Sequence, residues 1–245
     1  EKAGIIKRGV PVVIGERHPE TDAVFLTKAK ESDSLLSFAE DELSLFEINK
    51  TGQYLQVSVR QGENILFRNL QLALTGTYQL KNVLTVINAI LNLREQGYQI
   101  SDKAVHEALK KVTSLTGLQG RWQTLQQSPL VICDTGHNEA GISEVMQNIK
   151  NTPYQHLHMV FGVLKDKDVN TVLAMLPKEA TYYFTEPQLE RALPAAQLAS
   201  QGALHQLNGT VYATVEQALA AAKTQAASDD LIFVGGSTFV VAEVI

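Results

Sequence analysis

The sequence predicts an α/β protein whose second half forms a mostly parallel, doubly wound sheet. From Arg121 onward, short apolar segments alternate with segments of helical periodicity, and this alternation is typical of a parallel sheet with helices on both faces. The hydrophobic content of 44% and charged content of 19% exclude a disordered chain. The expected strands are 121–125, 130–134, 156–163, 180–184, 210–213 and 231–235, and the expected helices are 139–149, 169–176, 193–201 and 215–227.

The first half has a mixed α+β pattern. The segment 78–97 carries an i, i+3, i+4 apolar stripe and predicts a helix, and Ser101 is a suitable N-cap for a second helix over 101–112. Residues 113–120 are typical of a linker, so we expect one domain over 1–118 and another over 119–245. The remaining predicted elements are a helix over 20–32 and strands over 11–15, 36–38, 43–48, 54–60 and 65–74.

Composition excludes several classes of protein. The single cysteine, Cys133, permits no intrachain disulfide and argues against a cysteine-based zinc site, which favours a reducing, cytoplasmic compartment. No apolar run approaches the roughly 20 residues of a membrane span, and the net charge of −5 argues against nucleic-acid binding. The chain opens on Glu1 without a signal peptide, so we expect it to be a segment of a longer polypeptide.

Polar residues follow several of the predicted parallel strands, where ligands bind in such sheets. Asp134, His137 and Asn138 combine a carboxylate, an imidazole and an amide just before the helix predicted from residue 139. The alternative is a structural turn, because Asp and Asn also cap helices. Both interpretations stay open on the residues alone.

Further candidates lie beyond the later strands. Arg191 could grip a carboxylate or be a surface arginine, and Ser237 follows two glycines that allow close approach to the backbone, or it caps the last helix. Residues 162–168, with the charged Lys165, Asp166 and Asp168, are either a site or a solvated helix start capped by Asp166.

Three candidates stand apart from these strand ends. Arg121 lies at the domain junction, Asn82 lies one turn into the predicted helix, and Lys2 lies in an apolar segment that would partly bury it. An exposed lysine and an exposed arginine are the alternatives. Neither a GxxxxGK[ST] loop nor a GxGxxG turn occurs, so a standard phosphate-cradling loop is missing and a dehydrogenase is disfavoured.

Taken in order, several segments resemble the folylpolyglutamate synthase/dihydrofolate synthase family of the Mur ligase superfamily. The segments are EKAGIIKRGVPVV, GTYQLKN, GRWQ, CDTGHNEAG, GVLKDKD, RALP and VGGSTFVVAEV. The resemblance implies that 119–245 is a Rossmann-like glutamate-ligase domain and that 1–118 is the remainder of a central ATP-binding domain. The sequence departs from the family pattern at Trp122, Thr135, Gly136 and Glu139.

The resemblance implies an ATP-dependent amide ligase. In this family, a carboxylate of dihydropteroate or folate is phosphorylated to an acyl phosphate, which the amino group of L-glutamate attacks, with Mg²⁺ on the phosphates. We therefore expect ATP and Mg²⁺ as cofactors, a monomeric full-length enzyme, and no ATP turnover by the 245-residue chain alone. The alternatives are a peptidoglycan-precursor ligase and a non-catalytic module that binds an amino acid or a nucleotide.

The resemblance also implies a role for each matching residue. Lys2 corresponds to a carbamylated lysine near the magnesium ion, and His137 to a catalytic histidine between the nucleotide and glutamate. Asn82, Arg121 and Asp134 correspond to nucleotide-binding residues, and Ser237 and Arg191 join His137 in the glutamate site; Asn138, Lys165, Asp166 and Asp168 are further candidates.

Overall fold

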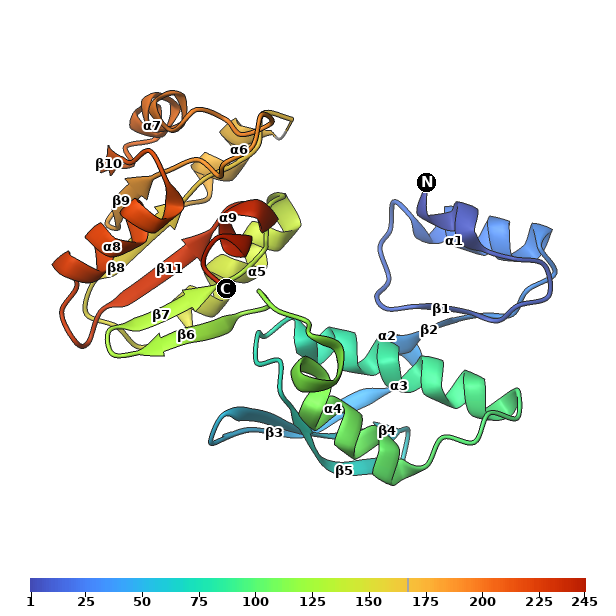
Figure 1. The fold of residues 1–245 in the computed structure, drawn as a ribbon. Helices are drawn as coiled ribbons and strands as arrows, with labels where there is room; N and C mark the ends of the chain where they lie inside the picture. Colours follow the sequence, from blue (N-terminus) through green and yellow to red (C-terminus); the bar gives the residue numbers. More distant parts are fainter. Residues whose placement is uncertain (167) are drawn as a thin grey trace. The chain divides into compact units, whose positions relative to one another are not determined.

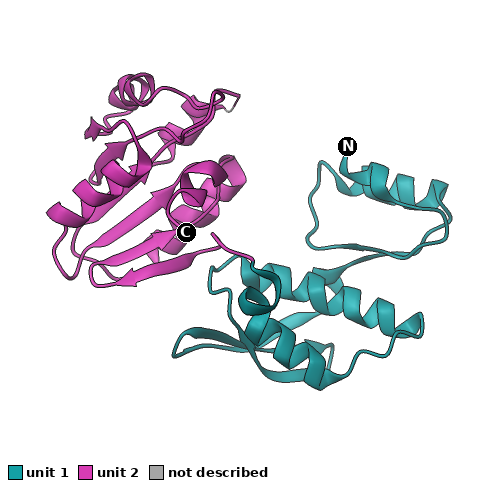
Figure 2. Ribbon diagram, in the orientation of Figure 1, with its two compact units in different colours: residues 1–117 teal, residues 118–245 magenta. Residues whose placement is uncertain are grey.

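The computed structural model describes residues 1–166 and 168–245, which divide into two compact units. Unit 1 comprises Glu1–Gly117 and unit 2 comprises Leu118–Ile245. Figures 1 and 2 show the two units, each of which has its own hydrophobic core.

Unit 2 is built on a six-stranded sheet, which confirms the predicted α/β fold. Five of its strands are parallel, and the sixth, the edge strand β6, pairs antiparallel with β7. Each strand that the sequence predicts in this half is present, within a few residues at its ends. The strand order is β10 (Gly209–Val211), β9 (Thr181–Phe184), β8 (Leu157–Phe161), β11 (Leu231–Gly235), β7 (Leu130–Cys133) and β6 (Gln123–Gln127).

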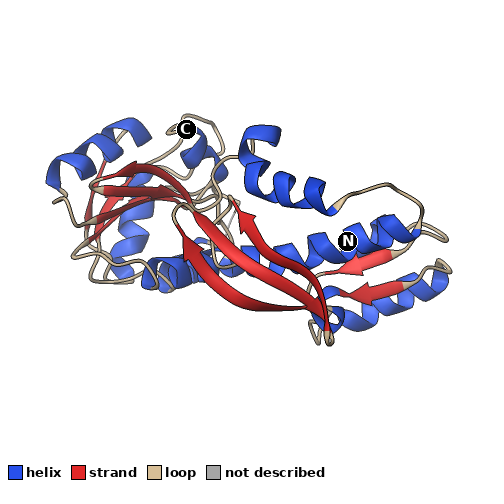
Figure 3. Ribbon diagram, turned by 90° about the horizontal axis from the view of Figure 1, so that it is seen from below, coloured by secondary structure: helices blue, strands red, loops and turns tan. Residues whose placement is uncertain are grey.

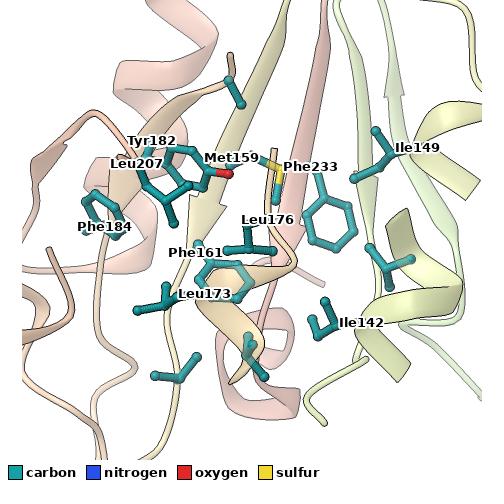
Figure 4. Packing of buried hydrophobic residues seen from close by; sticks show 14 of the residues in the cluster. Ile142, Ile149, Met159, Phe161, Leu173, Leu176, Tyr182, Phe184, Leu207 and Phe233 are labelled. Atoms are coloured by element: carbon teal, nitrogen blue, oxygen red, sulfur yellow. The ribbon is translucent and has the colours of Figure 1, made fainter. Parts of the chain in front are cut away.

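Helices cover both faces of this sheet, as a doubly wound fold requires. One face packs against α5 (Glu139–Lys150), α6 (Val169–Ala174) and α7 (Ala195–Leu204), and Figure 4 shows the apolar cluster between them. The other face packs against α8 (Val215–Gln225) and α9 (Thr238–Ala242). The central strands β8 and β11 are buried along their whole length, which explains why they appear in the sequence as apolar runs, interrupted only by His158 in β8.

Unit 1 contains two small sheets. Strands β1 (Val12–Ile14) and β2 (Leu36–Phe38) pair in parallel. In chain order, the 3-10 helix η1 (Lys2–Ile5) precedes β1, α1 (Asp22–Glu31) connects the two strands and α2 (Ala39–Glu42) follows β2. Strands β3 (Ser44–Thr51), β4 (Tyr54–Gln61) and β5 (Asn64–Leu72) form an antiparallel meander, visible in Figure 3. Its apolar face packs against α3 (Gln79–Glu95) and α4 (Asp102–Thr116).

The helix α4 differs from its predicted extent. Ser101 caps it as expected, accepting a hydrogen bond from the Ala104 N–H at 3.2 Å, but the helix continues to Thr116 instead of ending at Val112. The backbone at Lys111 is non-helical, and the helix ends where Gly117 adopts a φ of 69°. The predicted linker 113–120 is therefore partly helical.

The described residues include no helix that is both long and apolar enough to cross a bilayer.

Candidate functional site

Three parallel strands of unit 2 bring their carboxyl ends to one edge of the sheet. In register, Val234 of β11 lies opposite Cys133 of β7, and Gly235 lies opposite Phe161 of β8. The segments that follow these strands therefore begin side by side. They carry most of the residues that the sequence singles out in this half.

A pocket with a volume of about 210 Å³ opens at this edge. It brings together His137, Arg191 and Ser237, the three residues expected to hold glutamate. The other lining residues are Leu164, Gly236, Thr238 and Phe239. Phe239, the second residue of α9, is a pocket residue that the sequence pattern did not single out, although its place two residues after Ser237 was an available signal.

The backbone fixes the orientation of the His137 ring. Its Nδ1 lies 2.9 Å from the carbonyl oxygen of Thr135. A carbonyl can only accept a hydrogen bond, so Nδ1 carries the hydrogen and, in the neutral ring, Nε2 is the acceptor. His137 is thus set up to take a proton at Nε2.

Asp134 directly follows β7 and is only 4% exposed. One carboxylate oxygen accepts a hydrogen bond from the Trp122 N–H at 2.7 Å, and the other accepts one from the Gly136 N–H at 2.8 Å. The preceding residue, Cys133, is buried, and burial together with the Asp134 charge raises the pKa of its thiol to about 12. Cys133 therefore stays protonated and is no nucleophile at neutral pH.

Arg121 lies beside the same loop. Its Nη1 donates hydrogen bonds to the Thr135 hydroxyl and, at 3.3 Å, to the Gly120 carbonyl oxygen. The Thr135 N–H donates in turn to that carbonyl oxygen at 3.0 Å. Arg121, Asp134 and His137 therefore belong to one hydrogen-bonded group of loops.

The charged residues that follow β8 form an ion pair and a hydrogen bond with the segment that follows β9. Arg191 Nη2 lies 3.0 Å from Asp166 Oδ2, with both side chains more than half exposed. The Lys165 ammonium donates to the Glu190 carbonyl oxygen at 2.9 Å. Lys165 and Asp166 do not line the pocket, although Asp166 pairs with Arg191, which does.

The expectation that Asp166 caps the following helix is wrong. Asp168 is the N-cap of α6, and it accepts hydrogen bonds from the Thr171 hydroxyl and the Thr171 N–H at 2.8 Å and 3.1 Å. These two bonds hold the pKa of Asp168 below its ordinary value.

Two other candidates also cap helices. Asn138 accepts a hydrogen bond from the Gly141 N–H at 2.8 Å and caps α5. Ser237 is buried, caps α9 through the Phe239 N–H at 3.2 Å, and lines the pocket as well. The glycine before it is required, because Gly236 has a φ of 90° and a Cβ there would lie 2.7 Å from the Gly162 carbonyl oxygen.

The two remaining candidates belong to unit 1, whereas all lining residues of the pocket belong to unit 2. Asn82 lies near the start of α3, and its amide donates to Gln79 Oε1 at 3.0 Å. Lys2 lies in η1 and is exposed, so the expectation that it is partly buried is wrong. Among the described residues, no group of three or more His, Cys, Asp or Glu side chains is placed to hold a metal ion.

Comparison with known proteins places this geometry in a family context. Residues 120–238 match the family described as "Mur ligase, glutamate ligase domain". The chain is 30% identical over 245 residues to the dihydrofolate synthase/folylpolyglutamate synthase of Escherichia coli, and this match covers 100% of the chain and 53% of that relative. It is 27% identical to the folylpolyglutamate synthase of Lacticaseibacillus casei, covering 96% of the chain and 53% of the relative.

Solved structures of such enzymes share the fold. E. coli FolC in complex with DHPP and ADP matches with a TM-score of 0.81 and 29% identity, covering 100% of this chain and 54% of that one. The Mycobacterium tuberculosis folylpolyglutamate synthase complexed with ADP matches with a TM-score of 0.84 and 25% identity, covering 98% and 56%. The chain thus spans about half the length of the relatives that it matches.

Proposed function

We propose that the chain is part of an ATP-dependent ligase that joins L-glutamate to dihydropteroate or folate, because residues 120–238 match the Mur ligase glutamate ligase domain and the similar enzymes include dihydrofolate synthase/folylpolyglutamate synthase. The observation that carries this proposal is the convergence of His137, Arg191 and Ser237 on one pocket at the carboxyl edge of the sheet. These side chains offer a proton acceptor, a guanidinium and a hydroxyl, which suit an amino acid with two carboxylates.

Glutamate would bind with its functional groups divided among these three side chains. The Arg191 guanidinium has five N–H donors, and its bond to Asp166 uses Nη2, so other donors remain to bind a ligand carboxylate. The Ser237 hydroxyl suits a second polar group of the ligand. The amino group would then lie toward His137.

His137 would accept the proton that the reaction releases. When the amine attacks the acyl phosphate, the C–N bond forms, the C–O bond to phosphate breaks and inorganic phosphate leaves. The amine must lose a proton in this step, and the Thr135 carbonyl leaves Nε2 of the neutral His137 ring as the acceptor. We therefore assign His137 as the catalytic residue of this unit.

Arg121 would bind the nucleotide from unit 2, and Asn82 is a separate nucleotide-binding candidate in unit 1, with residues 1–118 as the remainder of the ATP-binding domain. The guanidinium of Arg121 lies at the loop beyond β7, where a phosphate fits its donors. The described residues include no cluster of three or more His, Cys, Asp or Glu side chains that could hold Mg²⁺, and the carbamylation of Lys2 remains a prediction. We also propose a cytoplasmic, monomeric enzyme without nucleic-acid partners.

The decisive experiment measures ADP release by the whole protein of which this chain is part, with magnesium, L-glutamate and either dihydropteroate or tetrahydrofolate. Release that requires both glutamate and a pterin substrate is expected, and the substrate identifies which addition occurs. Release only with a muramoyl precursor would move the protein to the peptidoglycan branch. No release with any substrate would favour the non-catalytic binding module.

The 245-residue chain provides a complementary test. Because its sequence contains no GxxxxGK[ST] loop, we expect no ATP hydrolysis by the purified chain, measured as phosphate release. Hydrolysis that stays with the chain through purification and disappears in Arg121→Ala would contradict this expectation.

A further inference from the structure

We infer that Asp134 is a positioning residue that couples the Arg121 loop to the His137 loop, so that the two residues are oriented as one unit. This role differs from direct contact with a nucleotide. It rests on hydrogen bonds to the backbone on both sides of the carboxylate.

The two carboxylate oxygens serve two different loops. Oδ2 accepts from the Trp122 N–H at 2.7 Å, and Trp122 directly follows Arg121 in the chain. Oδ1 accepts from the Gly136 N–H at 2.8 Å, and Gly136 directly precedes His137. Arg121 and His137 are therefore each the chain neighbour of a residue whose backbone N–H group Asp134 binds.

The loop that carries Arg121 needs such an anchor. Trp122 has a φ of 48°, a left-handed conformation that a bulky residue rarely adopts without support. Its ring is buried and stacks on Phe233 at 6.2 Å between centroids, and its N–H points to Asp134. Ring and carboxylate together fix the backbone at the residue next to Arg121.

Thr135 closes the connection between the loops. Its hydroxyl accepts a hydrogen bond from Arg121, its N–H donates to the Gly120 carbonyl at 3.0 Å, and its carbonyl accepts from His137 Nδ1. A displacement of the segment after Asp134 would therefore move the partners of both functional side chains.

The chemistry requires a carboxylate at this position. Asp134 presents two acceptor oxygens to two N–H donors, whereas an asparagine would present one oxygen and one amide nitrogen. The amide nitrogen would face a backbone N–H and leave it without its acceptor in a buried place. Asp134→Asn is therefore expected to break one of the two hydrogen bonds and, because Thr135 joins the two loops, to disturb both of them while changing the volume of the side chain very little.

The first test uses the 245-residue chain without any ligand, so it does not depend on the proposed function. Trp122 is the only tryptophan, and its fluorescence reports on the Arg121 loop, while the imidazole NMR signals report the tautomer of His137. We expect Asp134→Asn to shift both the Trp122 emission and the His137 signals. Asp168→Asn, the same substitution at the cap of α6, is the matched control and should change neither.

Two results would overturn the inference. One is an Asp134→Asn chain, folded by circular dichroism, in which only one of the two reporters shifts or neither does. The other comes from the unaltered chain, where the Trp122 and Gly136 amide protons should both exchange slowly with solvent. Fast exchange of either one contradicts the coupling even if the variant fails to fold.

A second test uses the whole protein and rests on the proposed function. A positioning role predicts that Asp134→Asn raises KM for both ATP and L-glutamate, by tenfold or more, since it disturbs Arg121 and His137 together. A direct nucleotide contact alone would raise KM for ATP and leave KM for glutamate unchanged. If the enzyme proves not to be a glutamate ligase, the ligand-free measurements still decide whether the coupling exists.

Discussion

Arg191 lines the unit 2 pocket, where we propose that it binds a carboxylate of glutamate. It pairs with Asp166 at 3.0 Å, but both side chains are more than half exposed, and exposed ion pairs contribute little free energy. A ligand carboxylate that reaches the guanidinium inside the pocket can therefore compete with Asp166.

The first prediction concerns the selectivity of Arg191. We expect Arg191→Ala to weaken L-glutamate binding by about 10- to 100-fold, the effect of losing a charged hydrogen bond, and to abolish the preference for L-glutamate over L-glutamine. Calorimetric titration of the chain with both amino acids measures this. Lys165→Ala removes a neighbouring cation that does not line the pocket and should leave both affinities unchanged; an equal loss for both amino acids in Arg191→Ala would refute carboxylate recognition.

The second prediction separates the capping role of Asn138 from a role in ligand binding. Its side chain accepts the Gly141 N–H at the start of α5, so Asn138→Ala should lower the free energy of unfolding by about 1 kcal/mol. Asn138→Asp keeps an acceptor at the same place and should unfold like the unaltered chain in thermal or urea melts. Unchanged stability in Asn138→Ala, with weaker glutamate binding, would instead assign Asn138 to the site.

At the level of elements, the sequence predicts the parallel sheet well for a physical reason. Strands β8 and β11 are covered on both faces, so they are apolar except for His158 in β8, and such runs are visible without any structure. The helix caps Ser101 and Asn138 are also visible, because few residue types make these bonds. The short helix α2 has four residues and shows no periodicity to detect.

The three-stranded sheet of unit 1 contains a feature that periodicity does not reveal. Near Ser58 of the central strand β4, the pairing shifts register with both neighbouring strands, β3 and β5. Glu47 of β3 and Asn69 of β5 lie at these shifts and have φ values of 53° and 54°. The buried Ser58 hydroxyl donates to Glu47 Oε2 at 2.9 Å and accepts from the Asn69 N–H at 3.1 Å. One hydroxyl thus joins two bulged strands to the strand between them.

The third prediction follows from this arrangement. Ser58→Ala should lower the free energy of unfolding by about 1–3 kcal/mol, because the Asn69 N–H loses its acceptor. Ser44→Ala is the control, since Ser44 lies on an exposed stretch of β3 and only accepts from Arg60; it should change stability by less than about 0.5 kcal/mol. Equal melts for the two variants would show that the register shifts do not depend on Ser58.

For the whole molecule, the sequence predicts where the site lies better than what each residue does there. Strand ends of a parallel sheet share one edge, so His137, Arg191 and Ser237 could be grouped from the order of elements. The hydrogen bonds of Asp134 and the ion pair of Asp166 depend on loop geometry, which leaves no periodic trace in the sequence. For the same reason Asp168, and not Asp166, proves to be the cap of α6.

The other end of the sheet contains a buried ionisable network that links three strands. His158 of β8 lies 2.9 Å from the Tyr183 hydroxyl of β9 and 3.3 Å from Asp230 Oδ2, just before β11, and His156 packs edge-on against its ring. Burial lowers the pKa of His158, with a further contribution from His156, against the opposing effect of Asp230. Burial, Tyr212 and Asp230 raise the pKa of Tyr183 to about 12, so its phenol stays neutral.

The pKa of Asp230 is lowered as well, like that of His158. Burial opposes its charge, but hydrogen bonds from the Ala227 N–H, from His158 and from the His156 N–H outweigh that effect and hold the pKa of Asp230 below its ordinary value. A group whose pKa is lowered on folding stabilises the fold above its unfolded pKa and loses that contribution as the pH falls. His158 and Asp230 therefore both make the fold less stable in acid, in two separate ranges of pH.

The fourth prediction is that stability falls as the pH drops below about 6.5, the ordinary pKa of histidine, because the folded chain resists protonation of His158. The ordinary range of Asp230, near pH 4, comes later, so the upper part of the decline belongs to histidine. Urea unfolding between pH 7.5 and 5 should show this decline, and His158→Gln should flatten it while lowering stability at neutral pH. His205→Gln is the matched control, because His205 is a partly exposed histidine outside the network, bonded to Asn170, and should keep the decline. A His158→Gln chain with the same pH dependence as the unaltered chain would place the acid-sensitive group elsewhere.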